Sequence, residues 1–329
     1  MAGVKALRKI QIGRESTAGT AVAATEIWRG EGAGEDQRTV VFPVEDVGYL
    51  SGVNRSYTPR VYGALDMSAT PATFEQLPHV LEAGVKTVSP TTDGSGQVRT
   101  YPLPTTAANT IKSYTLEAGD NQQAEEMEYS FVESFALEGR VGEAWNMSSA
   151  WRGRQWTPTT YTGALSLVPV EEMLFSKTKL YIDDATAAFG STLKSDTLLS
   201  ASLAVTTGLM PVFTANGELY FSFTKTVMPE VVLTITFEHD GTSVAEKALW
   251  RSETARNIRL ICEGSALGTP GATYSKKTVI IDLSGTWESF AALADENGND
   301  TVTATFRARY DTTAAHFATI VVVNEDSSL

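Results

Sequence analysis

The sequence predicts a mainly β protein in which a β-rich unit with one flanking helix occurs twice in tandem. Apolar and polar residues alternate with period two through most of the chain, which is typical of strands that bury one face. Only two segments, Thr73–Gly84 and Ser243–Ala255, have helical spacing. Each follows an alternating segment and precedes several more, so the order of elements repeats.

Length and composition narrow the functional classes. The chain has 329 residues, which is more than one ordinary core needs and favours two domains. Its net charge of −13 argues against a protein that grips duplex nucleic acid, because that requires clustered Lys and Arg. No apolar run reaches the length of a membrane span and no apolar signal segment is present. We therefore expect a protein made in a cytoplasm, without a membrane span.

In the first half, strands are expected at 39–44, 61–69 and 111–116, with a helix between the second and the third. Thr73 and Gln76 have the spacing of a capping box, and Gly84 is a suitable C-terminal stop. Pro78 weakens the helix, because a proline beyond the first turn removes a hydrogen bond.

A long hairpin is expected over Met127–Trp151, with two strands of about twelve residues that would each reach about 40 Å. Its first strand has an apolar side and a polar side. The side expected to pack against the protein consists of Met127, Tyr129, Phe131, Phe135 and Leu137. The opposite side includes Glu126, Glu128, Ser130, Ser134 and Glu138.

The second half repeats this order. Strands are expected at 199–205, 219–223, 231–237, 279–283, 301–310 and 317–323. The helix Ser243–Ala255 has a capping box made by Ser243 and Glu246. The two expected helix caps, Thr73 and Ser243, are 170 residues apart, so we interpret the chain as two diverged copies of one unit.

No constellation of residues predicts an enzyme, a metal site or a cofactor. The histidines His79, His239 and His316 are far apart in sequence, and with Cys262 they give no zinc-ligand spacing. The acidic run Asp295–Asp300 has no glycine at the sixth position of a calcium loop, and Phe306 stands where the loop needs a glutamate at the twelfth, so we expect a polar turn. We expect no catalytic residues, no metal ligands and no cofactor.

The opening run resembles the start of siphophage major tail proteins, which build the tail tube. The resemblance lies in a Gly-x-Glu-x-x-x-Gly-Thr stretch, here Gly13, Glu15, Gly19 and Thr20. The segment SATPATFEQLPHVLEAGV resembles the helix on the flank of tube domains, and the hairpin over Met127–Trp151 resembles their tube-forming hairpin. The whole chain resembles the fused two-domain version of that family.

The resemblance implies an N-terminal arm at 1–34 and two tail-tube-type β-sandwich or barrel domains at 35–160 and 161–329. Trimeric, pseudo-hexameric rings would stack into the hollow virion tail tube, through which DNA is ejected into the host without specific binding. The polar side of the hairpin strand would face the lumen. The implied partners are further copies of the chain, a tape-measure protein, a tail terminator and tail-tip proteins.

Two alternatives stay open. The N-terminal arm is either a flexible segment that orders on a neighbouring ring or a docked first strand at Lys9–Ile12. The alternative function is that of a carbohydrate- or receptor-binding β-sandwich of a virion or cell surface, for which Trp145, Trp151 and Trp156 would supply an aromatic platform.

Overall fold

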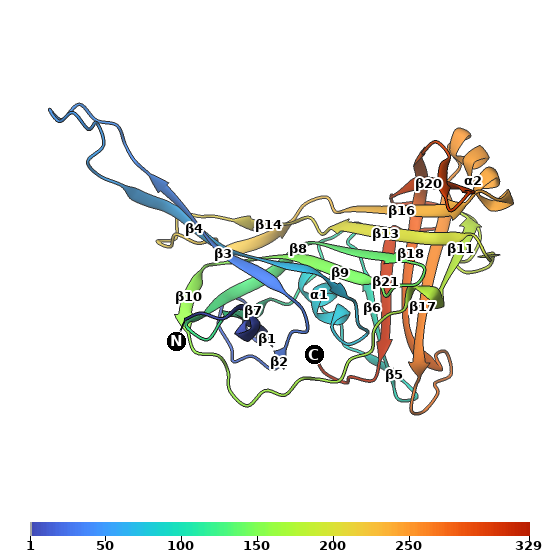
Figure 1. The fold of residues 1–329 in the computed structure, drawn as a ribbon, viewed down its shortest axis with the longest axis horizontal. Helices are drawn as coiled ribbons and strands as arrows, with labels where there is room; N and C mark the ends of the chain where they lie inside the picture. Colours follow the sequence, from blue (N-terminus) through green and yellow to red (C-terminus); the bar gives the residue numbers. More distant parts are fainter. Residues whose placement is uncertain (1) are drawn as a thin grey trace.

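The computed structural model describes residues 2–329 and is mainly β, as the sequence predicts (Figure 1). Among residues 2–329, strands hold 50% of the residues and helical segments 8%, and two of the helical segments are α-helices. The strands form one body from which a long hairpin extends at one end (Figure 1).

The elements of the first half are those up to the connector near residue 160. They are η1 (Lys5–Leu7), β1 (Lys9–Arg14), β2 (Glu26–Ile27), β3 (Gly32–Val41), β4 (Tyr57–Pro71), α1 (Leu77–Gly84), β5 (Thr91–Asp93), β6 (Gly96–Pro102), β7 (Tyr114–Gly119), β8 (Ala124–Arg140), β9 (Asn146–Gly153) and β10 (Trp156–Thr159).

The elements of the second half follow the connector. They are η2 (Phe175–Lys177), β11 (Thr178–Asp184), β12 (Leu193–Lys194), β13 (Leu198–Thr206), β14 (Leu209–Val212), β15 (Phe223–Thr226), β16 (Glu230–Glu238), α2 (Gly241–Arg251), β17 (Arg256–Ala266), β18 (Lys276–Phe290), β19 (Ala294–Glu296), β20 (Asn299–Ala308) and β21 (Ala318–Asn324).

One pattern of antiparallel strand pairings occurs in both halves. In the first half β1 pairs with β2 and β7, β4 pairs with β3 and β9, and β8 pairs with β7, β9 and β10. In the second half β11 pairs with β12 and β17, β16 pairs with β13 and β20, and β18 pairs with β17, β20 and β21. The hairpins β5–β6 and β14–β15 and the short β19 lie outside this pattern.

Backbone hydrogen bonds join the two halves. β8 pairs with β13 over Ser134–Arg140 and Ser200–Thr206, and β6 pairs with β21. The chain therefore contains one continuous row of strands, β3–β4–β9–β8–β13–β16–β20–β18, which we call the wide sheet.

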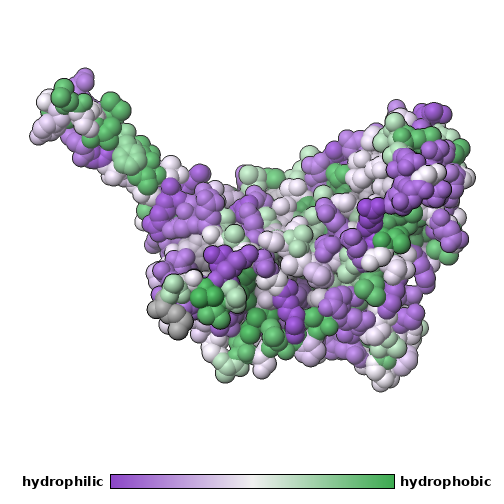
Figure 2. Space-filling model, viewed as in Figure 1, coloured by the Kyte–Doolittle hydropathy of each residue, from purple (hydrophilic) through white to green (hydrophobic). Residues whose placement is uncertain are grey.

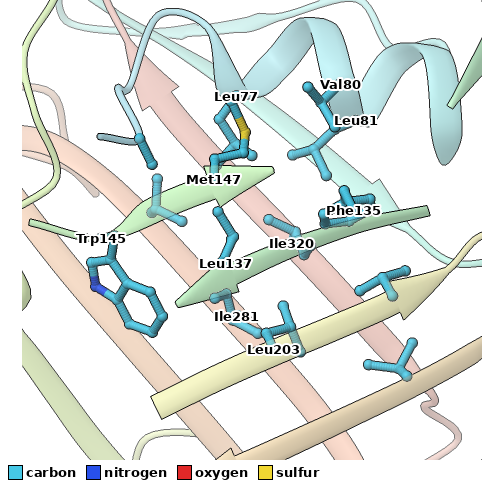
Figure 3. Packing of buried hydrophobic residues seen from close by; sticks show 14 of the residues in the cluster. Leu77, Val80, Leu81, Phe135, Leu137, Trp145, Met147, Leu203, Ile281 and Ile320 are labelled. Carbon is cyan, nitrogen blue, oxygen red and sulfur yellow. The ribbon is translucent and has the colours of Figure 1, made fainter. Parts of the chain in front are cut away.

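A single large core lies beneath the wide sheet and includes residues of both halves. Figure 3 shows α1 lying over Met147 and Phe135, and Leu137 of β8 close to Leu203 of β13. Because side chains from both halves fill the same interior, each half buries apolar surface that it would otherwise expose to water.

Both helices form where expected, but each begins at a different residue. α1 begins at Leu77, so Pro78 lies in its first turn, where a proline costs no helical hydrogen bond. The Thr73 hydroxyl still accepts a hydrogen bond from the Gln76 backbone N–H at 3.1 Å. α2 is capped by Asp240, which exchanges hydrogen bonds with Ser243, so the expected cap at Ser243 was three residues late.

The N-terminal segment contains the docked strand that the sequence left as an alternative. β1 pairs with β7 at six positions, from Lys9 with Gly119 to Arg14 with Tyr114. Ile10 and Ile12 are buried in the core. The segment that we expected to be an arm is therefore tied into the fold by its central strand, and β3 already begins at Gly32.

Candidate assembly surface

The strand that carries the predicted site residues, β8, is buried on its apolar side. Met127, Phe135 and Leu137 lie in the main core, with exposed fractions of 0 to 3%. Tyr129 is half-buried and Phe131 is fully buried, but both belong to a second, smaller cluster. The five residues expected on one face therefore divide between two clusters.

The division arises because β8 is not a regular strand. Tyr129 has a positive φ of 54°, and a β-bulge lies between Val132 and Ser134 opposite β9. A bulge adds one residue and reverses which side chains face the core. Val132 consequently lies in the main core, while its neighbour Phe131 packs against the other face of the strand.

The residues predicted to face the lumen lie in three different environments. Ser134 and Glu138 lie on the solvent side of the wide sheet, where Glu138 accepts a hydrogen bond from Ser202 at 3.4 Å. Glu126 and Glu128 lie in the half of β8 that pairs with β7 and β10, and burial raises the pKa of Glu128.

Ser130 is fully buried, and its hydroxyl donates to the Met127 carbonyl at 2.9 Å. The positive φ at Tyr129 turns this part of β8, so the alternation expected through Ser130 fails there. Ser130 therefore contributes nothing to the solvent side of the wide sheet.

The solvent side of the wide sheet is built from small polar residues, and we call it the polar face. The register of neighbouring strands places these side chains in rows across β9, β8, β13, β16 and β20. The polar face consists of Ser148, Ala150, Arg152, Ser134, Ala136, Glu138, Ser200, Ser202, Ala204, Thr206, Val232, Thr234, Thr236, Thr303, Thr305 and Arg307.

The arginines of the polar face are paired with carboxylates. Arg152 bonds Asp66 at 2.8 Å and Glu133 at 3.0 Å. Arg307 bonds Glu288 at 2.9 Å and also contacts Glu230. Each guanidinium is thus matched by two carboxylates, so the face offers a passing anion little free positive charge.

The wide sheet ends in two strand segments that pair on one side only. Within residues 2–329, β3 pairs with β4 alone. At the other end, residues 286–290 of β18 pair with β20, while the pairing of β18 with β17 stops at Gly285. Unpaired backbone N–H and C=O groups at such edges accept a further strand readily.

A projecting arm, which we define as residues 38–60, is the part of the β3–β4 hairpin that extends beyond the body of the molecule (Figure 1). Apolar side chains gather at its end, where Figure 2 shows them as green atoms. Those with substantial exposure are Val40, Phe42, Val44, Val47, Tyr49, Leu50, Val53 and Tyr57. Leu50 is as exposed as in an extended chain, so this apolar surface has no partner within the described part of the molecule.

The corresponding connection of the second half, residues 207–229, packs back on the body. Phe221 is fully buried against Phe131, with ring centroids 5.9 Å apart. Arg154 donates to the carbonyls of Phe221 at 3.3 Å and Ser222 at 3.2 Å. The two connections therefore differ in anchoring. Residues 207–229 also keep exposed apolar side chains such as Met228, but Phe221 fixes them to the body, whereas the projecting arm has no buried apolar residue.

The Gly-x-Glu-x-x-x-Gly-Thr stretch has a structural role. The carboxylate of Glu15 is fully buried and accepts hydrogen bonds from the backbone N–H groups of Gly19 and Tyr129, each at 2.8 Å. It also accepts from the hydroxyls of Ser113 at 2.6 Å and Thr115 at 3.1 Å. Glu15 thus joins the N-terminal segment to β7 and to the irregular point of β8.

We expect Glu15→Gln to lower the free energy of unfolding by about 2 to 3 kcal/mol, because the buried donors lose a charged acceptor and face an amide N–H. Urea unfolding followed by tryptophan fluorescence measures this change. Glu143→Gln is the control, since Glu143 is exposed and its substitution should cost less than about 0.5 kcal/mol. Equal costs for the two variants would contradict the role given to Glu15.

Two of the three histidines, His79 and His316, have structural partners. His79 contacts Tyr114 at 3.2 Å and Glu26 at 2.8 Å, and His316 contacts Ser284 at 3.1 Å. Burial raises the pKa of the Cys262 thiol to about 11. Across residues 2–329, no group of three or more His, Cys, Asp or Glu side chains is placed to hold a metal ion.

Neither helix in the described part of the chain has the length and apolar character needed to cross a membrane. Comparison of the sequence with models of protein families finds no match, and comparison with curated proteins finds no match either. A proposal on function therefore rests on the free edges, the polar face and the projecting arm.

Proposed function

We propose that the chain is a viral structural protein whose copies assemble into closed rings that stack as a hollow tail tube. The observation that carries the proposal is the pair of unpaired segments at opposite ends of the wide sheet, β3 and residues 286–290 of β18. Copies joined edge to edge would continue the sheet around a ring, and closure would leave no open edge.

The polar face suits the lumen of such a tube. Its Ser, Thr and Ala residues give DNA no strong contacts, and its arginines are already paired. Because the whole chain has a net charge of −13, phosphates are repelled. DNA would pass without specific binding, and Ser134 and Glu138 remain our predicted lumen residues.

The repeated strand pairings support two tandem tail-tube-type domains, each with one flanking helix. If each domain fills one position, three chains make a pseudo-hexameric ring. The projecting arm, with its exposed apolar end, is suited to contact the next ring of the stack. A virion tail location and contacts with a tape-measure protein, a terminator and tail-tip proteins follow from the same proposal.

The alternative, a carbohydrate- or receptor-binding module, has less support. Trp145, Trp151 and Trp156 have exposed fractions of 1, 0 and 5%, so they offer no aromatic platform. The cluster of exposed apolar residues on the projecting arm is also more typical of a protein–protein contact than of a sugar site.

A concentration series of the purified protein, examined by sedimentation velocity and negative-stain electron microscopy, tests the proposal. We expect hollow filaments with an axial repeat of about 40 Å, which lies between the reaches of the 8-residue β9 and the 17-residue β8. Compact monomers at every concentration, together with binding on a glycan array, would favour the alternative instead.

A further inference from the structure

The junction between the two halves is an example of how one sheet edge accepts another. Ser134 and Phe135 of β8 lie opposite Thr206 and Val205 of β13. The next residue, Thr207, closes the junction. Its hydroxyl lies 2.9 Å from both the Val132 and the Glu133 carbonyl and shares its one proton between them, and its backbone N–H donates to the Glu133 carbonyl at 3.0 Å. The backbone carbonyls at the bulge of β8 thereby receive hydrogen bonds from the incoming strand.

The edge at β18 has the same construction but no incoming strand. A bulge lies between Trp287 and Ser289 opposite β20, as one lies between Val132 and Ser134 opposite β9. In each case the extra residue is a glutamate that pairs with an arginine of the neighbouring strand. These pairs are Glu133 with Arg152 and Glu288 with Arg307.

The strand registers show which residues of β3, at the other edge of the wide sheet, correspond to the residues of β13 at the internal junction. Leu65 lies opposite Trp151 and Gly34, just as Leu233 lies opposite Phe306 and Leu203. Counting along the strands from these positions, Asp36, Gln37 and Arg38 of β3 correspond to Val205, Thr206 and Thr207. β3 is therefore the first-half counterpart of the strand that already occupies the β8 edge.

We propose that β3 of a second copy adds antiparallel to the β18 edge, with Gln37 opposite Ser289 and Asp36 opposite Phe290. Arg38 of that copy then takes the place that Thr207 takes in the internal junction. This contact rests on the proposed ring assembly and specifies which residues meet in it.

A cavity stands where Arg38 would enter. It has a volume of about 510 Å³ and lies between the end of α2 and β18, lined by Trp250, Arg251, Glu253, Thr286, Trp287, Glu288 and Arg309. In the first half the corresponding place is closed, because Gly84 at the end of α1 packs on Thr207 and Val132.

Charge and hydrogen bonding favour this occupant. Arg38 and Asp36 form an exposed ion pair at 2.6 Å. The cavity lining carries both signs of charge, with Glu253 and Glu288 for the guanidinium and Arg251 and Arg309 for the carboxylate, although Glu288 already pairs with Arg307. The Glu288 carbonyl accepts from the Trp250 indole at 3.2 Å. A carbonyl oxygen has two lone pairs. The Glu133 carbonyl uses both on Thr207, whereas the Glu288 carbonyl has one left for an incoming donor.

Paired cysteine substitutions test the register. In Gln37→Cys/Ser289→Cys, the two sites lie at opposite ends of an eight-strand sheet, roughly 30 Å apart at ~4.8 Å per strand, so a disulfide must join two chains. We expect copper-phenanthroline oxidation of assembled protein to give covalent dimers and trimers on a non-reducing gel. The native Cys262 is buried and should not compete.

Two control variants show how a matched pair and a mismatched pair of cysteines behave. Ser134→Cys/Thr206→Cys reproduces the same geometry within one chain and should form an internal disulfide. Val40→Cys/Ser289→Cys moves one partner by three residues, about 10 Å along the strand, and should not cross-link.

The outcomes separate this inference from the proposed function. Tubes that form normally while only the shifted pair, or neither pair, cross-links would overturn the register but leave ring assembly standing. Absence of both tubes and cross-links at high concentration, with the internal control oxidised, would contradict both.

Discussion

Replacing Val44, Tyr49 and Leu50 with serine should abolish filament formation while leaving the chain folded. These side chains are 73% or more exposed at the end of the projecting arm, so the folded monomer loses little when they change. If they are buried between rings, each contributes about 1.5 kcal/mol or more to assembly. The three together would raise the concentration needed for filaments by on the order of a thousandfold.

Sedimentation velocity and electron microscopy measure this effect, with circular dichroism as the test of folding. The matched control replaces Val4, Leu167 and Val244 with serine, three exposed aliphatic residues outside the arm. Filaments from the arm variant at the wild-type concentration would show that the arm is not the stacking contact. Loss of filaments in the control alone would point to a different surface.

Glu246→Leu should lower the free energy of unfolding by about 3 to 5 kcal/mol, because it leaves a buried guanidinium without its main partner. Glu246 is 1% exposed and receives two hydrogen bonds from Arg256, at 2.9 and 3.1 Å. It also accepts from the Trp287 indole at 3.0 Å. The carboxylate therefore fixes α2 to β17 and to the strand that carries the proposed acceptor edge.

The double variant Glu246→Leu/Arg256→Met is the decisive control for this ion pair. Removing both charges should recover much of the loss, since a buried pair is often replaceable by apolar side chains. Thermal and urea unfolding of the three proteins give the coupling energy. A double variant as unstable as the sum of the two single variants would mean that Glu246 acts through packing and not through charge.

Most strands were predictable because period-two alternation reports burial directly. Val231, Leu233, Ile235 and Phe237, for example, are all buried in β16. The strand expected at 219–223 was wrong, since β15 begins only at Phe223. The two irregularities of β8 were not predictable, because a positive φ at Tyr129 and a bulge after Val132 depend on contacts with Glu15 and β9. The alternation along one strand carries no information about such long-range contacts.

The candidate surface was predictable only in part. Ser134 and Glu138 follow the local alternation and do lie on the solvent side of the wide sheet. The free edges and the projecting arm depend on strand order, which the sequence does not specify. The expected strand at 39–44 marked part of the arm, yet nothing local distinguished Phe42 and Val44 from core residues.

The most direct test of the central claim is cryo-electron microscopy of the assembled protein viewed along the filament axis. We expect rings of three chains, with three-fold symmetry, six similar lobes and one continuous barrel of strands around a hollow lumen lined by the polar face. Solid filaments, or rings in which β3 and residues 286–290 of β18 both face solvent, would contradict the claim.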